Sequence, residues 1–206
     1  MGIPAEKRRY SIEEYLEWER KAESRHEFDN GEILAMSGGS PAQSFIIMNI
    51  GREVGNAIKG MPCRIAESNL RIGIQKQTKY LYPDASIICG PLQFDPIDKL
   101  KHTDIKPRVN IEVLSHSTEA YDRGDKFKSY RQIASLEEYI LLSQYQPQFE
   151  SMLLQPDGTW SFLACNGLDS VAKIRCLGID ILMKELYAGV DFSVPFDESQ
   201  ASDAST

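Results

Sequence analysis

The sequence has no long apolar run. None of its hydrophobic segments approaches the roughly 20 residues that a membrane-spanning helix needs. The basic residues at Lys7-Arg8-Arg9 are not followed by an apolar stretch, which argues against a secretory signal peptide. We therefore expect a protein without a membrane partner, whose 206 residues are enough to enclose a hydrophobic core.

Cysteine and histidine are scarce and lack the spacing of a zinc site. No C-x-x-C pair occurs among the four cysteines, and the three histidines show no metal-ligand spacing. Three of the cysteines lie in apolar, strand-like segments, where a free buried thiol is the ordinary state. We expect free thiols and a protein of the reducing cytoplasm. The residues concerned are Cys63, Cys89, Cys165, Cys176, His26, His102 and His116.

A strong basic run and a phosphate-binding loop are also absent. The formal net charge is −7, from 23 Lys and Arg against 30 Asp and Glu. Proteins that bind long duplex DNA through counterion release are usually basic, so this balance argues mildly against tight nonspecific DNA binding. The glycines at Gly38-Gly39 are not followed by the Gly-Lys-Ser/Thr pattern of a P-loop.

The sequence does contain an alternation of helical and extended patterns. Ser11 and Glu14 have capping-box spacing, and Asn30-Gly31 is a strong hairpin signal. Ser40-Pro41 is suited to open a helix. The order of segments predicts an α/β (α+β) fold with a parallel crossover after the strand that carries Glu112. The expected segments are helices over 11–21, 40–59, 117–132 and 179–187, hairpins over 25–36 and 149–165, and strands over 63–74, 80–89, 109–114, 138–143 and 171–176.

Residues 11–190 are expected to form a single domain. Residues 1–10 have the character of a flexible arm, and residues 191–206 that of a disordered acidic tail. The stretch 90–107 has lysines, an Asp-Pro pair and little periodicity. It is predicted to be a long loop that is either functional or mobile.

Two acids lie inside neighbouring strand-like segments, and a lysine follows on the next helix. A buried carboxylate needs a partner, a proton or a metal, and carboxylate oxygens are natural ligands of Mg²⁺. Asp84 and Glu112 would then hold Mg²⁺ (or Mn²⁺). Lys126 would lie beside the attacking water or the scissile phosphate, and Glu27 would add a third carboxylate from the first hairpin.

The same residues admit a purely structural explanation. Asp84 can cap a turn, and Glu112 can pair with a basic side chain of the following helix. Lys126 can simply bridge to Asp122 at helical i,i+4 spacing. Glu27 can be an exposed strand residue near the hairpin turn. Spacing alone leaves both interpretations open.

Longer motifs surround these residues. They are Tyr82-Pro-Asp84, Ile111-Glu112-Val-Leu-Ser115-x-Ser117-Thr118, Tyr121-Asp-Arg-Gly-Asp-Lys126-Phe and Tyr130-Arg-Gln-Ile-x-Ser135-Leu-x-Glu138-Tyr. Together they resemble the Uma-two family of bacterial restriction-endonuclease-like proteins, which belongs to the PD-(D/E)XK nuclease superfamily. The resemblance extends from about residue 11 to residue 190 and is most specific between Glu112 and Tyr139.

This resemblance implies a restriction-endonuclease-like fold, with a mixed central sheet flanked by helices and Mg²⁺ at an acidic pair. Asp84 resembles the first acid of the superfamily and Glu112 resembles the second. Glu27 matches the glutamate of the family's early hairpin.

The chain departs from the family pattern at several positions. The superfamily usually has lysine two residues after the second acid, where this chain has Leu114. Lys126 on the following helix is expected to take that role, with Lys128 as the fallback. Gln43 stands where the family often has a histidine, which weakens any proton transfer there, and His116 stands where it often has proline. Gln43 and Lys128 are assigned to substrate binding.

The resulting hypothesis is a Mg²⁺-dependent endonuclease that hydrolyses phosphodiester bonds in DNA. A homodimer is expected by analogy, because duplex cleavage often uses two copies. The competing hypothesis is a non-catalytic nuclease-fold protein for binding or regulation, which Gln43 and the acidic net charge favour slightly. A metal-dependent hydrolase of a small phosphate ester is a third alternative.

Overall fold

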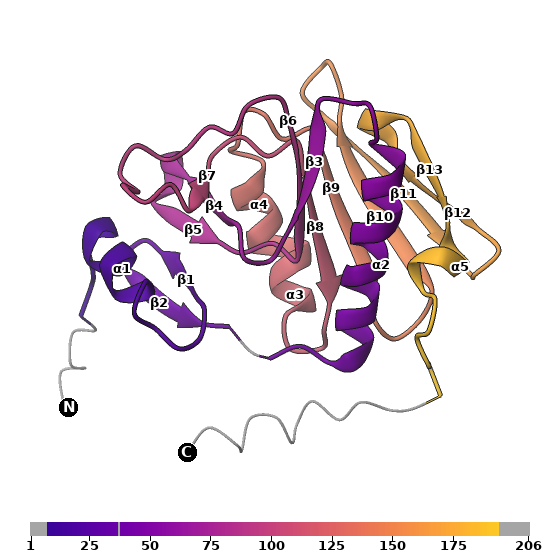
Figure 1. Cartoon of the computed structure of the whole chain (residues 1–206), viewed down its shortest axis with the longest axis horizontal. Coiled ribbons are helices and arrows are strands. Elements are labelled where there is room, and N and C mark those ends of the chain that lie inside the picture. Colours follow the sequence, from indigo (N-terminus) through magenta and orange to yellow (C-terminus); the bar gives the residue numbers. More distant parts are fainter. Residues whose placement is uncertain (1–7, 37, 194–206) are drawn as a thin grey trace.

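The computed structural model describes residues 8–36 and 38–193 and contains two main sheets that adjoin one another (Figure 1). The larger sheet has the order β11-β10-β9-β8-β6-β3. Its central strands β8 and β9 are parallel, as the predicted crossover requires, and the other pairs are antiparallel. The strands are β3 (Cys63–Glu67), β6 (Ala85–Cys89), β8 (Val109–Leu114), β9 (Glu138–Ser143), β10 (Gln148–Leu154) and β11 (Trp160–Asn166).

The smaller main sheet has five strands in the order β2-β1-β5-β4-β7. It contains the predicted hairpin, whose turn residues Asn30 and Gly31 both have positive φ. Its strands are β1 (His26–Asp29), β2 (Glu32–Ala35), β4 (Arg71–Ile74), β5 (Lys79–Leu81) and β7 (Thr103–Asp104). A separate two-stranded sheet joins β12 (Val171–Ile174) to β13 (Ile179–Leu182).

The first two helices begin where the sequence signals place them. Ser11 Oγ accepts a hydrogen bond from the Glu14 N–H while the Glu14 carboxylate accepts one from the Ser11 N–H, which completes the capping box. Ser40 Oγ caps the second helix by accepting from the Gln43 N–H. The helical segments are α1 (Ile12–Glu19), α2 (Pro41–Ala57), α3 (Glu119–Tyr121), the π-helical turn η2 (Asp122–Lys126), α4 (Phe127–Tyr130), α5 (Met183–Leu186) and the short 3-10 turns η1 (Gln75–Gln77) and η3 (Arg175–Leu177).

Side-chain alternation along β8 and β9 creates two interior layers. One layer packs the larger sheet against α2, α5 and the β12-β13 hairpin, and the other packs it against α4 and the smaller sheet (Figure 1). The first layer includes Ile50, Val54, Ile111, Val113, Ile140 and Leu142. The second layer includes Ile72, Leu81, Leu114, Tyr130, Tyr139 and Leu141, and therefore holds the two sheets together.

Two segments that were predicted to be single strands are each divided between the sheets. The segment 63–74 forms β3 in the larger sheet and β4 in the smaller one, and the segment 80–89 likewise forms β5 and β6. Pro83, which has no N–H for a ladder, lies in the second crossing. Because Asp84 follows Pro83 directly, this crossing places Asp84 where the sheets adjoin.

The predicted helix over 179–187 is wrong in its first half. Ile179 and Ile181 are buried while Asp180 and Leu182 are exposed, so the period is two, and these residues pair with β12 as β13. The stretch 90–107 contains β7 and is anchored by buried acids. Asp104, for example, accepts hydrogen bonds from the N–H groups of residues 93 and 106.

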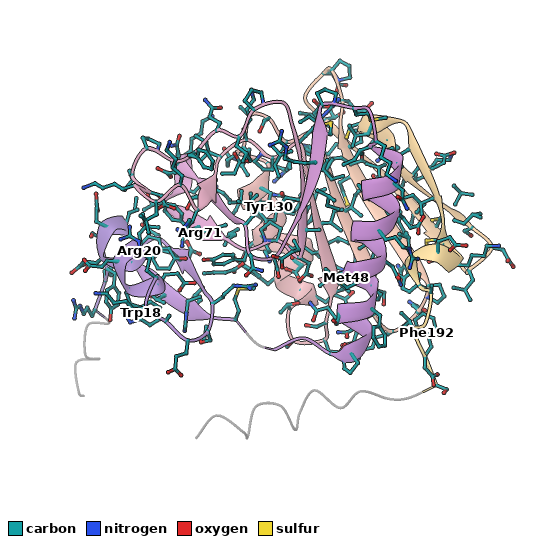
Figure 2. All side chains as sticks on the ribbon, in the orientation of Figure 1. Trp18, Arg20, Met48, Arg71, Tyr130 and Phe192 are labelled. Carbon is teal, nitrogen blue, oxygen red and sulfur yellow. A yellow bond between two sulfur atoms is a disulfide. The ribbon has the colours of Figure 1, made fainter. Side chains whose placement is uncertain are left out.

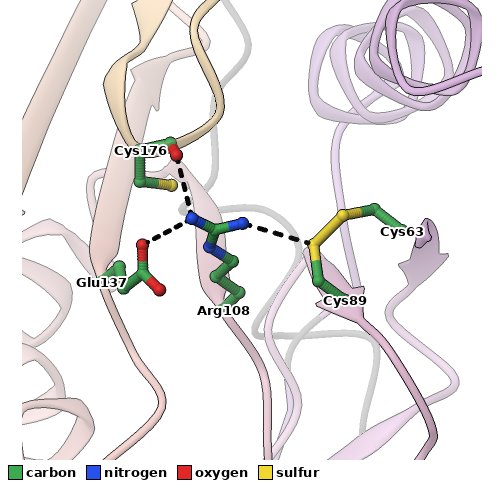
Figure 3. Close-up of a disulfide and its surroundings, with 5 residues drawn as sticks. All are labelled: Cys63, Cys89, Arg108, Glu137 and Cys176. Carbon is green, nitrogen blue, oxygen red and sulfur yellow. Dashed lines mark hydrogen bonds and ion pairs between the residues drawn. A yellow bond between two sulfur atoms is a disulfide. The ribbon is translucent and has the colours of Figure 1, made fainter. Parts of the chain in front are cut away.

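The expectation of free thiols is wrong for one pair of cysteines. Cys63 and Cys89 are direct partners in the register of β3 and β6, and they form a disulfide (Figure 3). Sequence spacing cannot reveal this pairing, because it depends on how two distant strands align. Cys165 and Cys176 are free thiols, as expected.

The described residues include only part of the predicted arm, residues 8–10, and only part of the predicted tail, residues 191–193. The Tyr10 N–H donates to the Gly31 carbonyl oxygen at 2.9 Å, which attaches the last residues of the arm to the hairpin. Residues 1–7 and 194–206 lie outside the described residues. Within the described ranges, no helix combines the length and the apolar character needed to cross a bilayer.

Candidate functional site

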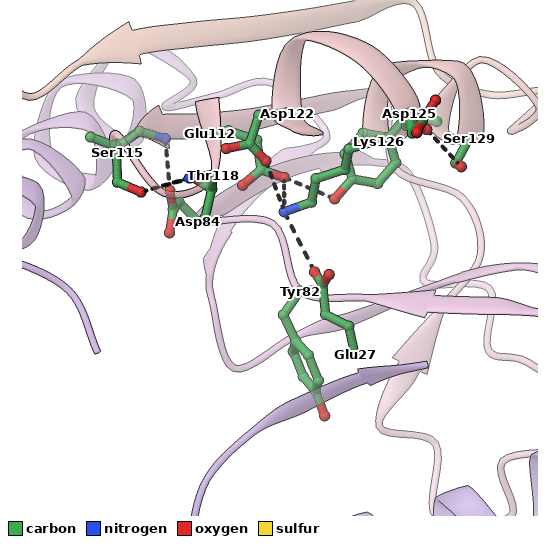
Figure 4. Close-up of polar contacts among 12 residues, drawn as sticks. Glu27, Tyr82, Asp84, Glu112, Ser115, Thr118, Asp122, Asp125, Lys126 and Ser129 are labelled. Carbon is green, nitrogen blue, oxygen red and sulfur yellow. Dashed lines mark hydrogen bonds and ion pairs between the residues drawn. The ribbon is translucent and has the colours of Figure 1, made fainter. Parts of the chain in front are cut away.

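Most of the predicted site residues meet where the two sheets adjoin (Figure 4). Glu27 comes from β1 of the smaller sheet, Glu112 from β8 of the larger sheet, and Asp84 from the crossing between them. Asp122 and Lys126 come from the π-helical turn, which lies next to both sheets. We call these five residues the acidic cluster.

Lys126 is the centre of the acidic cluster. Its Nζ atom lies 2.9 Å from Glu112 Oε1, 3.4 Å from Glu27 Oε1 and 3.5 Å from Asp122 Oδ1. The lysine is only 6% exposed, and the three acids are also buried. Glu27 is therefore a buried residue, not the exposed strand glutamate of the structural explanation.

The π-helical turn accounts for this convergence. It separates α3 from α4 and buries both Asp122 and Lys126 on one side of the helical stretch. Such turns are rare and frequently occur at functional sites. The sequence indicates Asp122 only as a helical neighbour of Lys126, whereas the structure makes it a fourth carboxylate of the cluster.

Asp84 is half-buried and is oriented by two donors. Its Oδ2 atom accepts a 2.7 Å hydrogen bond from the Val113 N–H, and Gln43 Nε2 lies 3.3 Å from both carboxylate oxygens. Burial raises the pKa of Asp84, and the hydrogen bond from Val113 opposes that rise. Because Val113 follows Glu112, this bond ties the Asp84 carboxylate to the strand that carries Glu112.

Glu112 is almost completely buried, and its carboxylate accepts a hydrogen bond in addition to its ion pair with Lys126. The Tyr130 hydroxyl donates to Glu112 Oε1 at 2.9 Å, and the Tyr139 hydroxyl donates to the Asp122 carbonyl oxygen at 3.1 Å. Burial raises the pKa of Glu112 well above its ordinary value, although the Lys126 ammonium opposes this. Sequence reasoning did not assign either tyrosine to the site. Only the i,i+4 spacing of Lys126 and Tyr130 indicated proximity.

A second polar network connects the segments that carry Glu27 and Asp84. Glu19 Oε1 at the end of α1 accepts from the His26 N–H and from the Tyr82 hydroxyl, both at 3.1 Å. His26 directly precedes Glu27 in the sequence, and Tyr82 lies two residues before Asp84. The Tyr82 N–H also donates to Glu27 Oε1 at 3.2 Å, so the two segments are bonded to each other as well.

Arg71 extends this network into the smaller sheet. The Arg71 side chain is labelled in Figure 2. Its Nη1 atom donates to the Tyr82 hydroxyl at 3.2 Å, and its Nη2 atom lies 2.9 Å from the buried carboxylate of Asp98. The predicted loop 90–107 is thus connected to the segment that carries Asp84. Sequence reasoning missed this connection because Asp98 and Arg71 are 27 residues apart.

Lys128 does not join the acidic cluster. Its side chain is exposed, and its Nζ atom lies 2.8 Å from Asp125 on the outer side of the helical stretch. The structure thus brings together Glu27, Gln43, Asp84, Glu112 and Lys126, whereas the substrate-binding roles of Gln43 and Lys128 stay predictions.

The charges of the acidic cluster are unbalanced. Four carboxylates and one ammonium leave three net negative charges if every group ionises, and protons or a cation must compensate for this in a buried site. Among the described residues, no group of three or more His, Cys, Asp or Glu forms a ready metal cage. Mg²⁺, however, usually takes only one or two carboxylates together with water and phosphate oxygens. Asp84, bonded to the strand of Glu112 through the Val113 N–H, and Glu112 itself are two carboxylates of the kind that this requirement names.

Known proteins resemble this chain along most of its length. The model of the Uma2 (Uma-two) family, described as "Putative restriction endonuclease", matches residues 12–182. The uncharacterized protein slr1290 of Synechocystis sp. (strain ATCC 27184 / PCC 6803 / Kazusa) is 35% identical over 183 residues, which cover 88% of this chain and 93% of that protein. The uncharacterized protein sll1609 of the same organism is 31% identical over 147 residues, which cover 71% of this chain and 82% of that protein.

The fold is also found in a solved structure. It is a putative nuclease belonging to DUF820 from Anabaena variabilis ATCC 29413, which superposes with a TM-score of 0.70 over 87% of this chain and 98% of that one. The sequence identity is 14%, so the likeness concerns the fold alone. The mixed sheets flanked by helices, together with this match, confirm the predicted restriction-endonuclease-like fold.

Proposed function

This chain belongs to the Uma2 ("Putative restriction endonuclease") family, and we propose that it is a Mg²⁺-dependent endonuclease that hydrolyses phosphodiester bonds in DNA. The observation that carries this proposal is the acidic cluster, in which buried carboxylates outnumber the one ammonium among them. Burying so many acids together costs stability, and a cation-dependent reaction gives a reason for keeping them.

Asp84 and Glu112 would hold the metal. When bound, Mg²⁺ (or Mn²⁺) supplies positive charge at the phosphoryl oxygens and lowers the pKa of a water ligand. The Val113 N–H and the Gln43 amide keep the Asp84 carboxylate in a fixed orientation. Gln43 cannot exchange a proton at neutral pH, so its role is to orient the acid.

Lys126 would act as a fixed cation and not as a base. Burial lowers the pKa of Lys126, but the surrounding carboxylates, Glu112 first, raise it more, and the net direction is well above the ordinary value. The ammonium therefore stays charged at neutral pH and can donate to the scissile phosphate or to the attacking water. Glu27 and Asp122 would keep it charged and aimed between the two sheets.

DNA is the proposed substrate, and the cytoplasm is the proposed location. The exposed ammonium of Lys128, on the same helical stretch as Lys126, would contact the DNA backbone outside the cluster. A homodimer would supply two such sites for the two strands of a duplex.

Nicking of supercoiled plasmid tests this proposal. We would compare the wild-type protein with Asp84→Asn, Glu112→Gln and Lys126→Met, in Mg²⁺, in Mn²⁺ and in EDTA. Lys173→Met is the matched control, because Lys173 lies on the β12-β13 hairpin in an exposed pair with Asp180. We expect metal-dependent nicking by the wild-type and control proteins and its loss in the three cluster variants.

Calorimetric titration of the same proteins with Mg²⁺ separates the outcomes. Metal binding without nicking would point to another phosphate ester or to a binding role. A wild-type protein that neither binds Mg²⁺ nor nicks DNA would refute the endonuclease mechanism. The acidic cluster would then be a structural element of a non-catalytic nuclease-fold protein.

A further inference from the structure

Glu150 is a buried acid outside the acidic cluster that lies on the same face of the larger sheet as Glu112. Leu141 of β9 pairs with Glu112 of β8 on one side and with Glu150 of β10 on the other. Directly paired residues of neighbouring strands point to the same face of a sheet, so both glutamates project into the same layer. Glu150 is only 6% exposed, and a carboxylate buried to this extent needs a partner.

Arg123 of the π-helical turn is the partner of Glu150. Its Nη1 atom pairs with Glu150 Oε2, and its Nη2 atom donates to Glu150 Oε1 at 3.2 Å, so the guanidinium holds both carboxylate oxygens. Its Nε atom also donates to Glu119 Oε1 at 2.7 Å, four residues earlier on the helical stretch. A bidentate pair fixes the relative orientation of its two planar groups as well as their distance. The π-helical turn is therefore attached to β10 in a defined orientation.

The helical stretch that carries Lys126 is thus joined to one face of the larger sheet by two ion pairs. Lys126 Nζ lies 2.9 Å from Glu112 Oε1 on β8. Three residues earlier on the stretch, Arg123 pairs with Glu150 on β10. The helix α3 has three residues and the π-helical turn has five, and helical segments this short are marginal on their own. Contacts with the sheet therefore determine where the turn lies.

We propose that Arg123 is a positioning residue of the candidate site, whose bidentate pair with Glu150 holds the π-helical turn so that the Lys126 ammonium lies at Glu112. Its role in catalysis rests on the proposed endonuclease function, because Arg123 would act only through Lys126. Lysine has a long flexible stem, so the position of its ammonium depends on where its backbone is held. A displacement of about 1 Å at a reacting group can reduce a rate by about 100-fold.

NMR of the Lys126 ammonium tests the positioning without reference to activity. The protons of an ammonium group buried in ion pairs are protected from exchange with water, and the signal is assigned by its absence from Lys126→Met. We expect a protected signal in the wild-type protein and its shift or loss in Arg123→Met, because the ammonium leaves Glu112. Arg123→Lys keeps the charge but not the bidentate fork, so it should show the same change to a smaller extent. This milder variant decides the question if Arg123→Met does not fold.

Arg108→Met is the matched control. Arg108 Nη2 lies 2.8 Å from Glu137 Oε2, and the arginine side chain is 31% exposed, against 35% for Arg123. This pair lies before the start of β8, beside Cys176 and the disulfide and outside the acidic cluster (Figure 3). We expect Arg108→Met and Arg123→Met each to lower the melting temperature by about 2–4 °C. Only Arg123→Met should change the Lys126 signal.

A double-mutant cycle in plasmid nicking tests the role in catalysis. Arg123→Met and Glu150→Met should each lower kcat about 10-fold to 100-fold with little change in KM, because the misplaced ammonium no longer meets the transition state. The double variant should be no slower than the slower single variant, since each single change already breaks the same pair. Arg108→Met should keep the wild-type kcat.

The outcomes separate the two proposals. A Lys126 signal that is unchanged in the Arg123 variants, or no protected Lys126 signal in the wild-type protein, refutes the positioning. A changed signal with wild-type kcat, or losses of kcat that multiply in the double variant, refutes the role of the pair in catalysis while the endonuclease function stands. If the signal changes as expected but the wild-type protein does not nick plasmid, the positioning of Lys126 stands and the endonuclease function is refuted.

Discussion

The Lys126→Met substitution tests whether one ammonium holds the acidic cluster together. Methionine keeps much of the length and apolar stem of lysine but removes its charge. The change leaves Glu27, Glu112 and Asp122 facing one another without the cation that lies within 3.5 Å of each. Removing one member of a buried ion pair typically costs about 3–5 kcal/mol, because the remaining charge is left uncompensated.

The size of the loss should depend on pH. The folded-state pKa of Glu112 is raised by burial, so its contribution to stability is present at low pH and is lost as pH rises through that pKa. Without Lys126 the pKa of Glu112 rises further, and the folded variant must keep a proton on this carboxyl. For each unit by which the pH exceeds the ordinary pKa of a glutamate, keeping that proton costs about 1.4 kcal/mol more. We expect a loss of about 3–5 kcal/mol at pH 8 and of only about 1 kcal/mol at pH 5.

Urea unfolding at pH 5 and pH 8 measures both values, with Lys173→Met as the control. The Lys173–Asp180 pair is exposed on both sides, and its loss should change the free energy of unfolding by less than about 0.5 kcal/mol at either pH. A loss below about 1 kcal/mol for Lys126→Met at pH 8 would refute the reasoning. So would an equal loss at both pH values, because protonation of the acids would then play no part.

Three other predictions follow from the same contacts. Burial raises the pKa values of both Asp84 and Glu112, so protons compete with Mg²⁺, and the calorimetric Mg²⁺ affinity should increase from pH 5 to pH 8. An affinity that is constant or falls over this range would contradict the assignment of these two ligands. Tyr82→Phe removes the hydroxyl bonded to Glu19 and should cost about 1–2 kcal/mol in urea unfolding. It should also weaken Mg²⁺ binding, and unchanged Mg²⁺ affinity would show that this network does not position Asp84. Reduction of the disulfide, which closes a loop with a sequence separation of 26, should lower the free energy of unfolding by about 2–4 kcal/mol. Urea unfolding with and without dithiothreitol measures this loss, and identical curves would mean that the pair is reduced in both samples.

Local signals account for the parts of the fold that are predictable from sequence. The capping box at Ser11, the Asn30-Gly31 turn and the Ser40 cap each depend on residues within a few positions of one another. The apolar run 109–114 and the run 138–143 have the character of buried strands, and they are the central parallel pair. These features need no knowledge of distant contacts.

The division of strands between sheets is not predictable in this way. The segments 63–74 and 80–89 have continuous extended patterns, yet each contributes to both sheets. Apolar residues such as Ile72 and Leu81 pack between the sheets, so their burial does not indicate to which sheet they belong. The Cys63–Cys89 disulfide escapes prediction for the same reason, since it depends on the register of two distant strands.

The candidate site shows the same limit at the level of side chains. Motif resemblance points to Asp84, Glu112 and Lys126, because the motif run from Glu112 to Tyr139 is specific. It gives no indication of Glu19, whose carboxylate contacts the segments that carry two of the cluster acids. The position of Glu19 follows from the packing of α1 on the smaller sheet, where Tyr15 and Leu16 lie against Phe28 and Tyr80.

The position of the acidic cluster between the two sheets explains why its members come from so many elements. Glu27 belongs to the smaller sheet and Glu112 to the larger one. The distances from both carboxylates to Lys126 therefore depend on how the two sheets pack together. That packing is provided by the apolar layer in which Leu81 and Leu114 take part. Neither sheet alone could bring these opposing charges within contact distance. The stability of this interface and the geometry of the proposed metal site are therefore set by the same contacts.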